Sequence, residues 1–135
     1  MRVLVDTSVW SRAFRRARAT EPLHPCVARL DTLLGKADVA LVGVVLQETL
    51  QGFREETAFR RVAKALEPFS LLPLSRSDHE RAARLRRVCA GAGVATSTTD
   101  CLIASAAISH RHALLTADAD FAAIAKHSAL RLVAY

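Results

Sequence analysis

The sequence predicts a single α/β domain over residues 1–135, in which a parallel sheet lies between helices. Short apolar or β-branched runs alternate along the chain with segments of helical periodicity, and this alternation is typical of parallel sheets covered by helices. A chain of 135 residues with 51% hydrophobic content is sufficient for one substantial core. No repeat, linker or low-complexity tract interrupts the pattern.

Each predicted strand is a short apolar run bounded by a turn residue or an acid. We expect strands at residues 2–5, 39–42, 69–74, 113–115 and 130–134. Pro73 lacks an N–H donor, so the third of these strands should lie at an edge of the sheet. The remaining periodic segments predict helices at residues 9–18, 27–34, 44–53, 55–66, 77–91, 100–109 and 118–126. Ser77 and Glu80 match the pattern of a capping box and should begin the fifth helix.

Composition excludes several classes of protein. No apolar run reaches the roughly 20 residues of a membrane span, and Asp6 interrupts the first apolar segment, so we expect a soluble cytoplasmic protein without membrane contact. Cys26, Cys89 and Cys101 are odd in number and lack metal-ligand spacing, which argues against a disulfide framework or a zinc site. We expect them to be small buried hydrophobes.

The charge balance favours a polyanionic partner. Lys and Arg total 19 against 13 Asp and Glu, and only three of the basic residues are lysines. Arginine pairs bidentately with phosphate, although a GC-rich genome would also enrich it. Candidate RNA contacts are the arginines near the first acid and along the fifth helix, namely Arg12, Arg15, Arg16, Arg81, Arg84 and Arg87. Trp10 could stack on a base or pack in the core, and the core is the better expectation.

Four acids should meet at one edge of the sheet. Asp6 follows the first strand directly and Asp118 follows the strand ending near Leu115, while Glu48 and Asp100 lie in helices that begin near the same edge. Each acid alone could be a turn residue, a helix cap or part of a solvated face. Gathered carboxylates repel one another and need a cation, and hard oxygen ligands select Mg²⁺ or Mn²⁺. The combination predicts a metal site that activates water for hydrolysis of a phosphodiester.

Four segments carry a resemblance to a known family: VLVDTSVW, VVLQETLQG, TTDCLIASAAI and LLTADADF. In order and separation they resemble the acidic motifs of PIN domains, and the opening is most similar to VapC ribonuclease toxins. The resemblance implies a three-layer α/β/α fold, Mg²⁺ or Mn²⁺ dependence and endonucleolytic cleavage of structured RNA such as tRNA or rRNA. It also implies homodimerisation and inhibition by a VapB-type antitoxin.

Carried over by motif, the resemblance assigns catalysis and metal binding to Asp6, Glu48, Asp100 and Asp118. It gives supporting roles to the hydroxyls of Ser8 and Thr116. In TADADF either acid could face the metal; we prefer Asp118, with Asp120 as the alternative that would otherwise cap the following helix.

Rival functions fit less well. A catalytically silent PIN-fold module that binds RNA or protein would be expected to lack at least one of the four acids. A haloacid dehalogenase phosphatase needs DxDxT where this chain has DTS, and a receiver domain needs a lysine after its last strands, where only Lys126 is available. No Gly-rich nucleotide-binding motif is present.

Overall fold

The computed structural model describes residues 1–15 and 22–135. In this part of the chain four strands form one sheet of order β3-β2-β1-β4, and every strand pairing is parallel. The strands are β1 (Arg2–Val5), β2 (Asp38–Leu41), β3 (Ser70–Leu71) and β4 (Ala113–Leu115). Val3 of the central strand lies opposite Val39 and Ala113. The predicted parallel α/β class is confirmed, and the strand preceding Pro73 lies at an edge as expected.

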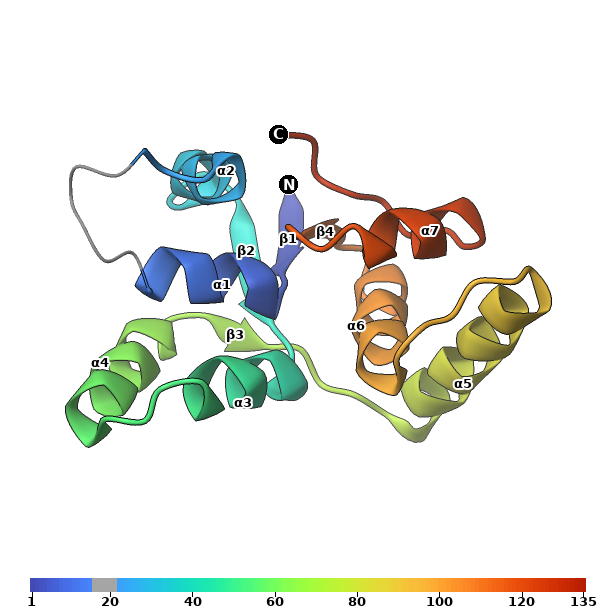
Figure 1. The fold of residues 1–135 in the computed structure, drawn as a ribbon, viewed down its shortest axis with the longest axis horizontal. Helices are drawn as coiled ribbons and strands as arrows, with labels where there is room; N and C mark the ends of the chain where they lie inside the picture. The colour runs from blue at the N-terminus through green and yellow to red at the C-terminus, as the bar shows by residue number, and fades with distance from the viewer. Residues whose placement is uncertain (16–21) are drawn as a thin grey trace.

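Helices flank this sheet on both sides of β1, as Figure 1 shows. Helices α1 to α4 gather on one side of β1 and α5 to α7 on the other. The bounds of the described helices are α1 (Thr7–Phe14), α2 (Pro25–Leu33), α3 (Gly43–Gln51), α4 (Glu56–Leu66), α5 (Arg76–Gly91), α6 (Thr98–Ser109) and α7 (Asp120–Lys126). None of them, within the described residues, is long and apolar enough to cross a membrane.

The fifth helix begins at a different cap from the one expected. Ser75 is the N-cap of α5, and its side chain and that of Asp78 form the capping box, whereas Ser77 and Glu80 take no part in it. A long-range contact explains the choice, because the second oxygen of the Asp78 carboxylate accepts a hydrogen bond from Ser109 of α6 at 2.7 Å. The buried Asp78 therefore joins two helices, and the backbone N–H of Ser75 lowers its pKa.

The expected last strand at 130–134 was wrong in extent. Leu132 forms one isolated parallel bridge with Leu114, and no regular strand follows in the described chain. The chain then turns away from β4, and Tyr135 donates a hydrogen bond to the backbone oxygen of Thr116 at 2.9 Å. This contact brings the carboxy-terminal segment against the loop that leaves β4.

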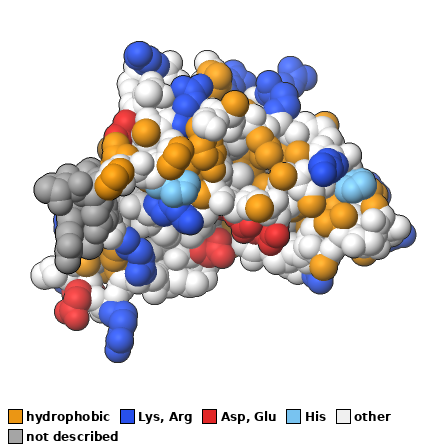
Figure 2. All heavy atoms as spheres, turned by 45° about the horizontal axis from the view of Figure 1, so that its top comes forward, with side chains coloured by type: hydrophobic (Ala, Val, Ile, Leu, Met, Phe, Trp, Pro, Cys, Tyr) orange, Lys and Arg blue, Asp and Glu red, His pale blue; other side chains and the backbone are white. Residues whose placement is uncertain are grey.

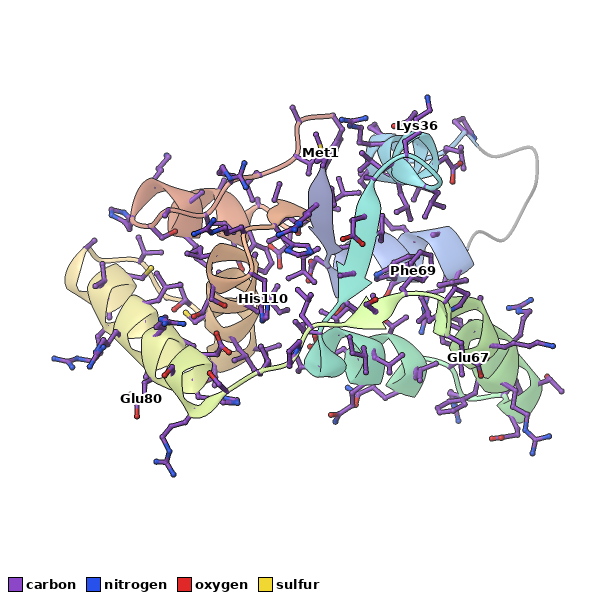
Figure 3. All side chains as sticks on the ribbon, turned by 180° about the vertical axis from the view of Figure 1, so that it is seen from behind. Met1, Lys36, Glu67, Phe69, Glu80 and His110 are labelled. Carbon is purple, nitrogen blue, oxygen red and sulfur yellow. The ribbon has the colours of Figure 1, made fainter. Side chains whose placement is uncertain are left out.

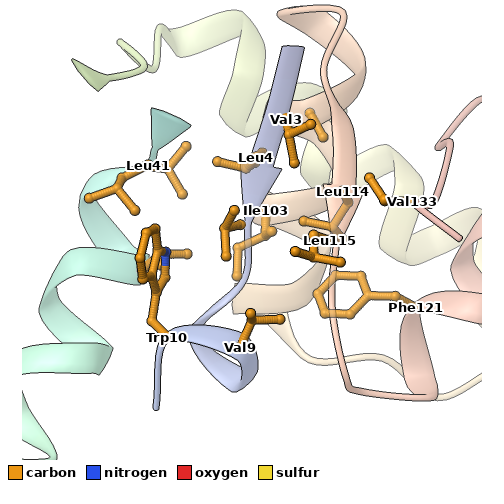
Figure 4. Packing of buried hydrophobic residues seen from close by; sticks show 14 of the residues in the cluster. Val3, Leu4, Val9, Trp10, Leu41, Ile103, Leu114, Leu115, Phe121 and Val133 are labelled. Atoms are coloured by element: carbon orange, nitrogen blue, oxygen red, sulfur yellow. The ribbon is translucent and has the colours of Figure 1, made fainter. Parts of the chain in front are cut away.

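The core lies where the strands meet α1, α6 and α7 (Figure 4). Val3, Leu4 and Leu114 are fully buried in it, and Phe121 of α7 is the largest side chain that is fully enclosed. Trp10 is 3% exposed and packs against Phe69 with ring centroids 5.2 Å apart, so the prediction that it belongs to the core is confirmed. The expectation for the cysteines is also confirmed, since all three are buried thiols without a disulfide.

Candidate metal centre at the carboxyl ends of β1 and β4

Asp6 lies where β1 ends and α1 begins. Asp6 is the N-cap residue of α1, and one oxygen of its carboxylate, Oδ2, accepts hydrogen bonds from Ser8 Oγ at 2.7 Å and Thr116 Oγ1 at 2.9 Å. The N–H of Ser8 also approaches this oxygen, at 3.4 Å. Asp6 is 5% exposed. Because the described residues give all these donors to Oδ2, the other oxygen, Oδ1, keeps its lone pairs for a ligand.

Two hydroxyl groups connect the end of β1 to the loop after β4. Ser8 Oγ accepts a hydrogen bond from the N–H of Ala117 at 2.9 Å, and Thr116 Oγ1 accepts one from the N–H of Asp118 at 3.0 Å. The same two hydroxyls donate to Asp6, so the carboxylate of one strand end and the backbone of the other are held in one network. The supporting positions expected for Ser8 and Thr116 agree with this geometry.

Three further carboxylates converge beside this network. Asp100, Asp118 and Asp120 each offer an oxygen, and these three oxygens lie within 4.8 Å of one another. Asp100 stands in the first turn of α6, where Ser97 caps the helix by accepting the N–H of Asp100 at 3.0 Å. Asp118 Oδ1 accepts the N–H of Asp120 at 2.9 Å, so Asp118 rather than Asp120 satisfies the start of α7. The structure thus brings both acids of the TADADF segment to the cluster.

The electrostatics of this cluster act most strongly on Asp100. Partial burial of its carboxyl group, followed by repulsion from Asp118, raises the pKa of Asp100 to about 6. Asp6 and Asp120 add smaller repulsions in the same direction. The other three carboxylates therefore lie close enough to Asp100 to oppose its ionisation, and a bound cation would relieve that repulsion.

Glu48 lies outside the three-carboxylate cluster, and a hydrogen bond with Thr7 connects it to the edge of the site. It belongs to α3, and its Oε1 accepts a hydrogen bond from Thr7 Oγ1 at 3.0 Å. Thr7 directly follows Asp6, so α3 and the start of α1 are joined at the edge of the site. Glu48 is half-buried there and retains a second carboxylate oxygen.

Comparison with known proteins identifies this arrangement. A family model described as the PIN domain matches residues 3–127, which is most of the chain. The chain belongs to the PIN-domain family. Within that family, it is 34% identical over 128 residues to Ribonuclease VapC51 of Mycobacterium tuberculosis, a match that covers 93% of this chain and 86% of the relative. This PIN domain is therefore a VapC-type ribonuclease, as the four acidic motifs predicted.

Solved structures agree on the fold of the PIN domain. The chain from VapBC2 of Rickettsia felis, solved bound to a promoter DNA fragment, superposes with a TM-score of 0.78 at 18% identity, covering 100% of this chain and 99% of that one. The chain from FitAcB of Neisseria gonorrhoeae superposes with a TM-score of 0.75 at 24% identity and covers 98% of this chain and 96% of its own. The three-layer arrangement that the resemblance implied is thus shared with these proteins.

The candidate arginines that follow Asp6 in the chain form hydrogen bonds with other residues of the PIN domain. Arg15 donates to the backbone oxygen of Gly52 and lies over the ring of Phe53, 4.9 Å from its centroid. Arg12 is exposed and donates weakly to the backbone oxygen of Ser8, at 3.4 Å. Arg12 and Arg15 also line a groove between α1 and α2. Arg16 lies outside the described residues.

The three candidate arginines of α5 also differ in whether they already contact the protein. Arg81 pairs with Asp78 at 3.5 Å, whereas Arg84 and Arg87 are exposed and line a shallow hollow together with Val88. On the face drawn in Figure 2, acidic side chains gather near the middle while Lys and Arg stand at separate positions around them. Positive charge therefore surrounds an acidic centre rather than covering it.

Sequence reasoning missed three residues that the PIN domain uses at this edge. Thr7 holds Glu48, Ser97 caps the helix that carries Asp100, and Tyr135 supports Thr116. The signal for Ser97 was present, because Ser97 and Asp100 have the S-x-x-D spacing of a cap. Thr7 and Tyr135 act through contacts between distant segments, which no local pattern reveals.

Proposed function

We propose that this VapC-type PIN domain is an Mg²⁺- or Mn²⁺-dependent endoribonuclease that hydrolyses structured RNA, such as tRNA or rRNA. The observation that carries the proposal is the convergence of Asp100, Asp118 and Asp120 within 4.8 Å, beside an Asp6 whose carboxylate is oriented by hydroxyl groups. Four carboxylates at the carboxyl ends of parallel strands suit a hydrolytic metal site.

The residues present fit a small hard cation. Two oxygens bound to one Mg²⁺ at about 2.1 Å lie at most about 4.2 Å apart, so small side-chain rotations would bring the clustered oxygens to one ion. Every donor is a carboxylate oxygen, and burial together with repulsion from Asp118 raises the pKa of Asp100. Asp6, Asp100 and Asp118 are the proposed direct ligands, with Asp120 as the neighbouring alternative to Asp118 and Glu48 at the edge.

Side chains and a helix end of this chain would orient the metal ligands and attract the phosphate of the substrate. Mg²⁺ or Mn²⁺, when bound, supplies a Lewis acid that lowers the pKa of water and neutralises charge on the leaving oxygen. Ser8 and Thr116 keep the Asp6 carboxylate in one orientation by donating to a single oxygen. The N-terminus of α6 adds a positive dipole beside Asp100, which favours an approaching phosphate.

The proposed partners follow from the family. We propose that a VapB-type antitoxin inhibits the enzyme by placing a basic side chain among the acids and so displacing the metal, that the chain forms a homodimer, and that it acts in the cytoplasm. The similar chains of known structure come from VapBC and FitAB assemblies. An arginine from a partner would find unneutralised carboxylates at Asp100 and Asp118, which supports the inhibition model.

The catalytic proposal is tested by neutral substitutions at two acids. Asp6→Asn and Asp100→Asn should each abolish Mg²⁺-dependent cleavage of a structured RNA while thermal melting stays cooperative. Glu56→Gln is the matched control, because it removes one negative charge from an exposed position on α4. Cleavage retained by both purified site variants would overturn the catalytic assignment. An unmodified protein that binds RNA but leaves it intact in Mg²⁺ and Mn²⁺ would instead support a silent binding module.

The inhibition model has a separate test. The chain is co-purified with the product of its neighbouring gene, and RNA cleavage is measured with and without excess Mg²⁺. Inhibition that weakens as Mg²⁺ increases would support competition at the acids. A bound partner that leaves cleavage of a short RNA unchanged would refute the inhibition model while leaving the nuclease assignment intact.

A further inference from the structure

A groove of about 480 Å³ lies between α5 and α6. Figure 3 shows these two helices side by side at one end of the molecule. Alanines and Leu102 form an apolar floor, while Arg86, Arg87 and His79 line the groove as well. None of the described residues that line it is acidic. An apolar floor with a basic, acid-free margin suits a ligand that is flat and apolar on one part and anionic on another.

Arg86 places positive charge at the start of α6, the helix that carries Asp100. Its Nη1 donates a hydrogen bond to Thr98 Oγ1 at 2.8 Å. Thr98 is the first residue of α6, and Asp100 stands two residues further in the same turn. The groove therefore begins at the helix start that carries Asp100 and extends away from it along α5. Residues two apart do not share a helix face, so the groove and the Asp100 carboxylate lie on different faces of the start of α6.

Most of the hydrogen-bonding capacity of Arg86 is unused. A guanidinium carries five N–H donors, and Thr98 takes one of them. Within residues 1–15 and 22–135, Arg60 and Arg81 are the arginines that form ion pairs, so no carboxylate neutralises Arg86. A planar guanidinium with remaining donors matches a phosphate group, which can accept two parallel hydrogen bonds.

We propose that the α5–α6 groove is a substrate subsite that holds a nucleotide of the RNA outside the acid cluster. Arg86 binds the phosphate of that nucleotide, and the apolar floor covers one face of its base or ribose. Arg87 adds charge or stacks on the base, as arginine planes do in single-stranded RNA recognition. This inference rests on the proposed ribonuclease function, and it adds Arg86, which sequence reasoning did not select.

The test compares two arginine variants of equal charge. RNA binding is measured by fluorescence anisotropy without divalent metal, and cleavage kinetics are measured in Mg²⁺. Arg86→Ala should weaken binding about tenfold and reduce the slope of log K against log salt by about 1. KM should rise while kcat stays nearly constant. Arg60→Ala, on exposed α4, should change affinity less than about twofold. Arg86→Lys should keep the salt slope and recover only part of the affinity.

Several outcomes overturn the subsite. If Arg86→Ala and Arg60→Ala bind RNA equally well while unmodified protein cleaves normally, the subsite is wrong and the ribonuclease proposal stands. If the unmodified protein cleaves no RNA in either metal, the proposed function itself fails. Ala83→Trp adds bulk at the groove and should also weaken RNA binding. If this variant instead changes the molar mass in light scattering and leaves RNA affinity unaltered, the groove belongs to a second copy of the chain.

Discussion

Replacing Asp100 by asparagine should stabilise the metal-free protein. Burial and the neighbouring Asp118, Asp6 and Asp120 raise the pKa of this carboxyl group from 3.8 to about 6. That rise corresponds to about 3 kcal/mol of opposition to the charged form. Solvent screening at this partly exposed group reduces the expected gain to about 1–2 kcal/mol at pH 8. The neutral amide keeps the shape of the side chain and removes the repulsion.

The gain should depend on pH in a defined direction. Because the folded-state pKa of Asp100 is raised, its contribution to stability is fully present below 3.8 and is lost as pH rises through about 6. The difference in unfolding free energy between Asp100→Asn and the unmodified protein should therefore be small near pH 4 and reach its full value above pH 7. Urea denaturation in EDTA across this range measures it.

The order of thermal stability of Asp100→Asn and the unmodified protein should reverse when metal is added. Saturating Mg²⁺ should raise the melting temperature of the unmodified protein by ligand linkage and have little effect on Asp100→Asn. Glu56→Gln, at an exposed position on α4, should alter neither result. An Asp100→Asn protein that is no more stable than the unmodified one in EDTA at pH 8 would refute the argument from repulsion.

Three further predictions concern the same site. Asp118→Asn should reduce the Mg²⁺-dependent rise in melting temperature more than Asp120→Asn does; the reverse order would make Asp120 the fourth ligand. Mg²⁺ affinity measured by calorimetry should fall as pH drops through about 6, since Asp100 must lose its proton to bind. The pH midpoint of activity should also move lower as the Mg²⁺ concentration increases. A Mg²⁺ affinity that does not change between pH 5 and pH 8 would contradict this prediction. Tyr135→Phe should cost about 1 kcal/mol of stability and weaken Mg²⁺ binding, because it removes the hydrogen bond that supports Thr116; unfolding and titration curves that match the unmodified protein would disprove that role.

Local patterns predicted most helices and strands, because the spacing of apolar residues within each segment follows the face that the segment buries. The runs at 2–5 and 113–115 are strands as expected; Asp6 follows the first directly, and Asp118 lies in the loop after the second. The strand at 69–74 is limited to Ser70–Leu71, since Pro73 lacks the N–H that would continue the ladder. The α1 helix begins at Thr7 rather than at residue 9, because the Asp6 carboxylate accepts the N–H of Ser8 and so moves the cap forward.

Contacts between distant segments decided the cases that local patterns got wrong. Two overlapping S-x-x-acid patterns compete at the start of α5, and the contact between Asp78 and Ser109 selects the first. The stretch at 130–134 has strand composition, yet in the structure it makes a single bridge, between Leu132 and Leu114. At the start of α5, one hydrogen bond to a remote residue outweighs a weak local preference.

The sequence by itself determined the parallel α/β class, the strand ends that carry Asp6 and Asp118, and the family. Hydrophobic periodicity and short acidic motifs are local properties, so they can be read without coordinates. Only the tertiary structure decided that Asp120 joins Asp100 and Asp118, that Glu48 lies apart from them, and that Arg86 rather than Arg81 keeps an unpaired charge. Those outcomes depend on distances between α3, α5, α6 and the loop after β4. Packing sets such distances, and no spacing along the chain encodes them.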